Sequence, residues 1–96
     1  MIVSFGDKAT RDVFNGEDSK YSRKIPSILH AVACRKLDML NAACRPEDLK
    51  APPANRLEHL KGNYEGFYSI RINDQYRIIF RFQESNAFDV SIIDYH

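Results

Sequence analysis

Apolar and polar residues alternate through the last third of the chain, with short breaks at 73–75 and 84–86. Successive side chains of a β-strand point to opposite faces, so this period of two predicts strands over 68–72, 76–82 and 88–94. The breaks are expected to be turns, which makes the three strands an antiparallel meander with one apolar face. The residues expected on that face are Tyr68, Ile70, Ile72, Tyr76, Ile78, Phe80, Phe82, Phe88, Val90 and Ile92.

The opposite face of the same strands collects Arg71, Arg77, Arg81, Ser91 and Tyr95. A guanidinium offers a planar fork of donors that matches phosphate oxygens, so an open sheet face with converging arginines can bind phosphate. The alternative is that these arginines only form the solvated face of the sheet. A bulge, or a one-residue slip in the first hairpin, would exchange the two faces.

The first half of the chain shows helical spacing instead. Asp7 can cap a helix over 8–15, which Gly16 is expected to end. A longer helix is predicted over 26–41, because its apolar residues recur at the i, i+3, i+4 spacing of a helix that lies on a core. Pro26 suits its first turn, where a missing N–H costs nothing.

Two further strands are expected, over 1–5 and over 56–60, and a turn follows the second of them. The predicted fold is therefore α+β. Two N-terminal helices pack on one face of a twisted, mainly antiparallel sheet of about five strands, in a single domain over residues 1–96.

Composition excludes several classes of function. The 96 residues carry 14 Lys+Arg against 13 Asp+Glu, whereas a free-standing nucleic-acid binder usually has a clear basic excess. Any contact with nucleic acid is therefore expected from a local cluster. No apolar run approaches the roughly 20 residues of a membrane span, and no secretory signal is visible, so we expect a cytoplasmic protein without membrane contact. The two cysteines form no zinc-type spacing, and no nucleotide-binding glycine motif is present, so neither a metal nor another cofactor is predicted.

Polar residues outside the meander supply further candidates. His96 directly follows Tyr95 at the end of an apolar strand and could act as a general acid or base, unless it is only a frayed end. Glu58 and Lys61 could supply a base and a cation for a phosphate, or only an ion pair at a strand end. The other residues that could contact RNA, or simply form solvated faces, are His59, Lys20, Arg23, Lys24, Arg35 and Lys36.

Three blocks of the sequence carry a resemblance to a known family. They are RLEHLKGN at 56–63, GFYSIRINDQYRI at 66–78 and the ending IDYH at 93–96. Together with the Met-Ile-x-Ser-Phe start, they resemble the HigB-type toxins of bacterial type II toxin–antitoxin systems, within the RelE superfamily. The resemblance extends over essentially the whole chain, and it implies a compact protein with helices packed on an antiparallel sheet.

The resemblance implies a ribosome-dependent endoribonuclease that cuts messenger RNA in the decoding site without a metal, by attack of a 2′-hydroxyl on the adjacent phosphate. The residues that match the family's catalytic residues are Arg77 on the sheet, Lys61, and the terminal pair Tyr95 and His96. Where some members carry a histidine, this chain has Glu58, with His59 one residue later. The general base is therefore left open between Glu58 and His96, and protonated His96 is the natural acid.

The resemblance also implies partners. These are the ribosome with its message and a helix-turn-helix antitoxin of the HigA type, through which alone operator DNA would be contacted. Two other functions stay open at this point. One is a catalytically weak homologue that acts mainly as an antitoxin-binding module in operon repression, and the other is a gyrase-inhibiting relative on the same fold. The presence of Arg77, Tyr95 and His96 favours the enzyme.

Overall fold

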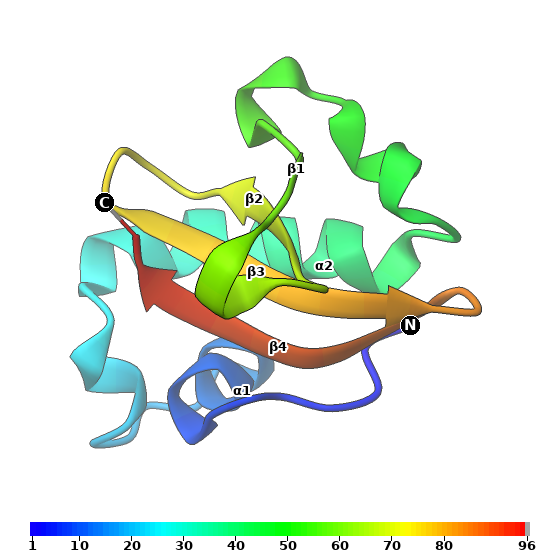
Figure 1. Ribbon diagram of the computed structural model, residues 1–96. Helices are drawn as coiled ribbons and strands as arrows, with labels where there is room; N and C mark the ends of the chain where they lie inside the picture. The colour runs from blue at the N-terminus through cyan, green and yellow to red at the C-terminus, as the bar shows by residue number, and fades with distance from the viewer. Residues whose placement is uncertain (96) are drawn as a thin grey trace.

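The computed structural model describes residues 1–95, which form two α-helices and one antiparallel sheet, with short 3₁₀ turns in the connections (Figure 1). The helices are α1 (Lys8–Asn15) and α2 (His30–Ala42). The strands are β1 (Glu58–His59), β2 (Tyr68–Arg71), β3 (Tyr76–Gln83) and β4 (Asn86–Asp94), in the order β1-β2-β3-β4. The predicted α+β class and the antiparallel meander are confirmed. Within the described range, neither α-helix has the length and apolarity to cross a membrane.

The hydrophobic core lies between the helices and one face of the sheet. α1 contributes Val13, and α2 contributes Leu37 and Leu40, both of which are fully buried. The strand residues that they meet are Ile70, Ile72, Ile78, Phe80, Ala87, Val90 and Ile92. Tyr68, Tyr76 and Phe82 pack at the margin of this cluster. The apolar face predicted from the period of two is therefore confirmed, except at Phe88.

α1 begins and ends as its sequence predicts. The Oδ1 atom of Asp7 accepts a hydrogen bond from the backbone N–H of Thr10 at 2.7 Å, which caps the N-terminus. Gly16 follows the last turn with φ +71°, in the left-handed conformation that glycine adopts without strain. This short helix is amphipathic, and its buried residues are Thr10, Asp12 and Val13.

The second helix begins four residues later than the predicted start at Pro26. Pro26 is extended (ψ 129°), so it stands outside the helix and precedes a single 3₁₀ turn over 27–29. His30 then opens α2, and its Nε2 atom lies 2.8 Å from the Ile25 carbonyl oxygen and 3.1 Å from that of Ser22. Because both neighbours are acceptors, Nε2 carries the proton and ties the preceding loop to the helix.

A β-bulge near the start of β4 interrupts the regular pairing of the sheet. The pairs on its two sides are Ile79 with Ser91 and Arg81 with Phe88, so three steps along β4 oppose two steps along β3. Asp89 lies inside the bulge with φ +53°, a left-handed conformation that is uncommon for any residue with a side chain.

The bulge exchanges the faces of β4 on its N-terminal side. Ala87 pairs with Phe82 and is fully buried in the core. Phe88 instead shares the face of its partner Arg81, away from the helices. The predicted core position of Phe88 is wrong because the alternation that placed it assumes a strand without an extra residue.

The N-terminal segment 1–5, predicted as a fifth strand, makes only two isolated parallel bridges with β4. Ile2 pairs with Ala87, before the bulge, and Phe5 pairs with Val90, which lies within it. Because the irregular backbone at Asp89 lies between these bridges, they do not join into a ladder. The sheet therefore has four strands, and the expectation of about five is wrong.

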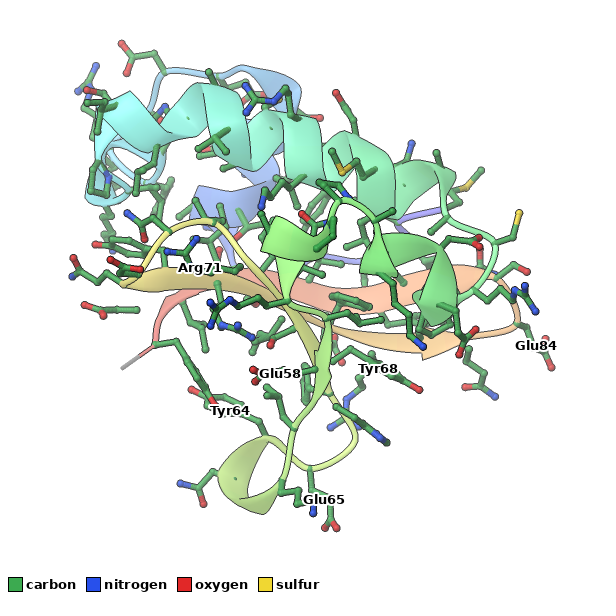
Figure 2. The ribbon with its side chains drawn as sticks, turned by 90° about the horizontal axis from the view of Figure 1, so that it is seen from above. Glu58, Tyr64, Glu65, Tyr68, Arg71 and Glu84 are labelled. Carbon is green, nitrogen blue, oxygen red and sulfur yellow. The ribbon has the colours of Figure 1, made fainter. Side chains whose placement is uncertain are left out.

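β1 is shorter than the strand predicted over 56–60. Arg56, two residues before β1, has φ +46°, which interrupts the extended backbone. After β1, the N–H of Leu60 donates to the Phe67 carbonyl at 2.8 Å and closes a loop over 61–66. Figure 2 shows this loop on the side of the sheet opposite to α2. The face expected to be open is thus partly covered, and Ile79 on it is only 4% exposed.

Thr10 attaches α1 to the sheet, and its loss should destabilise the protein. Its hydroxyl is fully buried and accepts a hydrogen bond from the N–H of Ile92 at 2.8 Å. Thr10→Val keeps the shape but leaves that N–H without a partner, so we expect the free energy of unfolding in urea to fall by about 1–3 kcal/mol. The Ile92 amide should also exchange with solvent faster. Thr10→Ser keeps the acceptor and should retain protection of that amide; unchanged protection in Thr10→Val would show that the bond is not needed.

Candidate functional site

Arg77 is the centre of the candidate site, on the face of β3 away from the helices. It is only 7% exposed, so its charge must be compensated inside the protein. Its Nη1 atom donates to the hydroxyl of Ser69 on β2 and lies 3.3 Å from the Oε2 atom of Glu58 on β1. Three neighbouring strands thus hold one guanidinium in place.

Tyr95 covers Arg77 from the end of β4. The centre of its ring lies 5.6 Å from the guanidinium carbon, which is a cation–π contact. The backbone N–H of Tyr95 donates to the Gln75 carbonyl at 2.6 Å, so Tyr95 is anchored to the β2–β3 turn. The structure therefore brings together three of the predicted catalytic residues, Glu58, Arg77 and Tyr95. The predicted acid His96 lies outside the described residues.

The contacts of the Arg77 guanidinium with Ser69 and Glu58 lie at one of its N–H groups, under the Tyr95 ring. Both contacts use Nη1. Among residues 1–95, no carboxylate or carbonyl oxygen pairs with its Nε or Nη2 atom. These two N–H groups point in parallel, in the geometry that binds two oxygens of one phosphate.

Arg71 stands directly opposite Arg77 in the β2–β3 ladder. Two like charges at paired positions destabilise a sheet unless each has its own counter-charge. Arg71 forms an ion pair with Asp74 in the hairpin, and Arg77 has Glu58. The two arginines therefore stand side by side at one end of the sheet, each with a carboxylate of its own.

Lys36 is a further cation near Arg71, and its position differs from the one that the sequence predicts. The sequence predicts Lys36 on the surface, either as an RNA contact or on a solvated face. In the structure it is 8% exposed, and its Nζ atom donates to the Arg71 carbonyl at 2.5 Å. Burial, followed by the charges of Arg71, Arg35 and Arg77, lowers the pKa of this lysine from its usual 10.5. α2 thus contributes a buried cation next to β2 rather than a cation on the surface.

The remaining predicted residues of β1 and its loop divide between two faces. Glu58 pairs with Ser69 on the face of Arg77, whereas His59 pairs with Tyr68 on the other face. The His59 ring stacks on Tyr68 with 4.6 Å between ring centres. The structure therefore separates His59 from Arg77. Lys61 is exposed, directly before the 3₁₀ turn over 62–64.

The basic residues of the loop before α2 lie apart from Arg77. Lys20 and Lys24 have their Nζ atoms 5.2 and 5.8 Å from the centre of the Tyr21 ring. Lys24 and Tyr21 line a hollow with Ile92, which belongs to the core face of the sheet. Arg23 is held by two hydrogen bonds to Asp18, of 2.9 and 3.0 Å. This loop does not contribute to the cluster around Arg77.

Arg81 shares the face of Arg77 but lies further along β3. Its guanidinium stacks on the ring of Phe67 and forms an ion pair with Asp89. No group of three or more His, Cys, Asp or Glu residues within 1–95 could hold a metal ion. Cys34 and Cys44 are both free thiols.

Comparison with known proteins gives a consistent result over the whole chain. Residues 3–96 match a family model described as a RelE-like toxin of the type II toxin–antitoxin system HigB. Toxin HigB-1 of Vibrio cholerae serotype O1 is 45% identical over 87 residues, which cover 91% of this chain and 90% of that protein. An uncharacterized protein of Haemophilus influenzae is 47% identical over 73 residues, 76% of this chain and 71% of that protein.

Two solved structures share the fold. Both are YoeB–YefM complexes from Staphylococcus aureus, and each matched chain has a TM-score of 0.61 over 100% of this chain and 95% of its own length. Sequence identity is only 19% and 18%, so this likeness concerns the fold alone.

Lys36 should make stability depend on alkaline pH. Its pKa is lower in the folded protein than in the unfolded chain, so between these two values the unfolded chain binds more protons. The free energy of unfolding therefore gains a contribution that rises as the pH approaches 10.5. Urea unfolding of the wild type and of Lys36→Met from pH 7 to pH 10 would measure it. The free energy of unfolding of the wild type minus that of the variant should increase with pH. If the two free energies changed with pH in parallel, the buried charge of Lys36 would be contradicted.

Proposed function

The chain belongs to the HigB-like toxins of type II toxin–antitoxin systems, a RelE-like family, and on that premise we propose that it is an endoribonuclease that cleaves messenger RNA in the decoding site of the ribosome. The observation that carries this proposal is the Nε–Nη2 edge of Arg77. It is fixed by Ser69 and Glu58 and lies beside Tyr95 at the end of β4. A guanidinium held in this way is a ready site for the phosphate that is to be cut.

Access to that edge requires a movement of Tyr95. Arg77 is 7% exposed, whereas Tyr95, which lies over it, is 36% exposed. In the proposed complex the tyrosine ring swings off the guanidinium, and a phosphate takes its place against Nε and Nη2. The displaced ring is then free to stack on a neighbouring base, because base–aromatic stacking tolerates any sequence.

The proposed reaction is an intramolecular displacement at phosphorus. The 2′-oxygen forms a bond to the adjacent phosphorus while the bond from phosphorus to the 5′-oxygen breaks. A base takes the proton of the 2′-hydroxyl, and an acid gives one to the leaving 5′-oxygen. The products are a 2′,3′-cyclic phosphate and a 5′-hydroxyl. Arg77 and Lys61 stabilise the charge that grows on the phosphate oxygens in the transition state.

We assign the base to Glu58 and the acid to His96. The Glu58 carboxylate lies 3.3 Å from the guanidinium that would hold the phosphate, so it stands beside the reacting atoms. A base must come within hydrogen-bond reach of the proton that it removes, and in the proposed complex the 2′-hydroxyl lies on the Glu58 side of the bound phosphate. His96 follows Tyr95 in the sequence, and a protonated imidazole is the natural donor to the leaving oxygen.

The proposed partners are the ribosome and an antitoxin. With a net charge of +1, the protein has little long-range attraction for RNA, so a ribosome that presents the message would supply the missing affinity. We further propose a helix-turn-helix antitoxin of the HigA type as the neutralising partner and as the contact with operator DNA. The S. aureus neighbours, which are complexes of YoeB with YefM, support an antitoxin partner. Such a toxin acts in the cytoplasm, where the ribosomes are.

The experiment uses purified bacterial ribosomes programmed with a defined message, and maps cuts by primer extension. Cuts should fall within the codon in the decoding site and only when ribosomes are present. Folded protein that binds its antitoxin but makes no cut would favour the alternative, a catalytically weak toxin that acts mainly in operon repression.

Arg77→Lys should reduce cleavage by about 10²–10³-fold, because a lysine keeps the charge but loses the two parallel donors. His96→Ala should abolish cleavage while folding is retained, as judged by circular dichroism and thermal unfolding. Arg45→Ala is the matched control, since Arg45 is an exposed arginine whose nearest carboxylates are 3.9 and 4.0 Å away. Its cleavage should equal that of the wild type. A folded Arg77→Lys protein with wild-type cleavage would overturn the role of Arg77.

A further inference from the structure

Figure 2 shows Arg71 toward one end of the sheet and Glu84, in the β3–β4 hairpin, toward the other. A hollow is lined by residues of β3 and β4 next to that hairpin. Its volume is about 340 Å³. The residues that line it are Gly66, Arg81, Phe82, Gln83, Phe88 and Asp89. Pockets for small molecules begin at roughly 300 Å³, so this hollow has room for one planar ring system.

Arg81 lines the hollow and is held by two neighbours, Phe67 and Asp89. Its guanidinium carbon lies 4.3 Å from the centre of the Phe67 ring, so the two planar groups are in close contact. At its edge, Nε lies 3.5 Å from the Oδ2 atom of Asp89. Both side chains are about half exposed, at 51% and 56%. A guanidinium held by a ring and by a carboxylate keeps a fixed plane while it stays open to solvent.

The backbone at two distant positions is shaped to permit this arrangement. Gly66 has φ +91°, and a Cβ atom added there would lie 3.1 Å from the Nη1 atom of Arg81. Asp89 has φ +53° inside the bulge, where its N–H is held by the hydroxyl of Ser4 at 2.9 Å. Bulges re-aim side chains, and unusual backbone conformations concentrate at functional sites. Here both flank the same arginine.

The charge of this hollow differs from that of the site at Arg77. Asp89 compensates Arg81, so the hollow favours an uncharged group over a phosphate. Its polar groups are complementary to a nucleobase: the carboxylate accepts from an amino group, the guanidinium donates to a ring nitrogen or carbonyl, and its plane can stack. Phe88, which the bulge turns onto this face, adds an apolar side.

We propose that this hollow binds one base of the RNA strand, a few nucleotides from the phosphate held at Arg77. The inference rests on the proposed function, because it extends the same strand along the same sheet face. Arg77 and Arg81 are four residues apart on one face of β3, about 13 Å at 3.3 Å per residue. The Asp89 carboxylate favours a base with an exocyclic amino group, so adenine, cytosine or guanine binds more tightly than uracil.

The test is a direct titration that needs no ribosome. Isotope-labelled full-length protein is titrated with four RNA tetranucleotides that differ only in the third base, and NMR signals of the Arg81 side-chain N–H and the Asp89 amide are followed. We expect both signals to shift, with a dissociation constant at least about fivefold lower for one or more amino-bearing bases than for uracil. Equal affinities for all four bases, or no shift of these signals, would overturn the proposal.

Variants sharpen this test. Asp89→Asn replaces an acceptor-only group by one that also donates, and asparagine tolerates the left-handed backbone well, so the protein should fold and lose the preference against uracil. Arg81→Lys should lose it too, whereas the control Arg45→Ala should keep it. An unchanged preference in both site variants would contradict the assignment.

Cleavage on ribosomes separates this inference from the proposed function. Asp89→Asn should still cut in the decoding site, with an altered preference for the base that the hollow reads. If the wild type makes no cut but binds the tetranucleotides selectively, the proposed function fails and the base site stands. If the wild type cuts but shows no selectivity in the titration, the proposed function stands and the base site fails.

Discussion

A buried guanidinium must be compensated where it lies, and the sheet is arranged around this requirement for Arg77. One N–H donates to the Ser69 hydroxyl, and the Glu58 carboxylate supplies the counter-charge from β1. β1 is only two residues long, yet one of the two is Glu58. If β1 moved away from β2, a charge with 7% exposure would lose its carboxylate, which is costly in a poorly solvated place. The need to neutralise the charge of Arg77 therefore holds the edge strand β1 in place against the rest of the sheet.

Patterns within short segments of the sequence are enough to predict much of this fold. The caps at Asp7 and Gly16 and the alternation through β2 and β3 are properties of short segments, so they can be predicted from the residues alone. The bulge in β4 cannot, because it requires Asp89 in a conformation that its residue type does not announce. The same bulge explains two errors, the position of Phe88 and the fifth strand.

The candidate site was predictable to a similar extent. Alternation places Arg71, Arg77, Arg81 and Tyr95 on one face, and the structure brings Tyr95 against Arg77. The ion pair with Glu58 depends on how β1 is registered against β2, which no local pattern of two residues fixes. Burial of Lys36 likewise results from the packing of α2 near the end of β2. Contacts of this kind, between segments that are distant in the sequence, cannot be predicted from periodicity.

The two edges of the sheet give this chain a further property. An exposed strand edge is a template onto which another chain can add, and this is a common start of aggregation. One edge, β1, is two residues long, which offers almost no length for such pairing. Along the other edge, the first five residues bond to β4 at Ala87, before its bulge, and at Val90, within it. The irregularities that break the ideal sheet pattern thus also protect the chain from joining copies of itself through their strands.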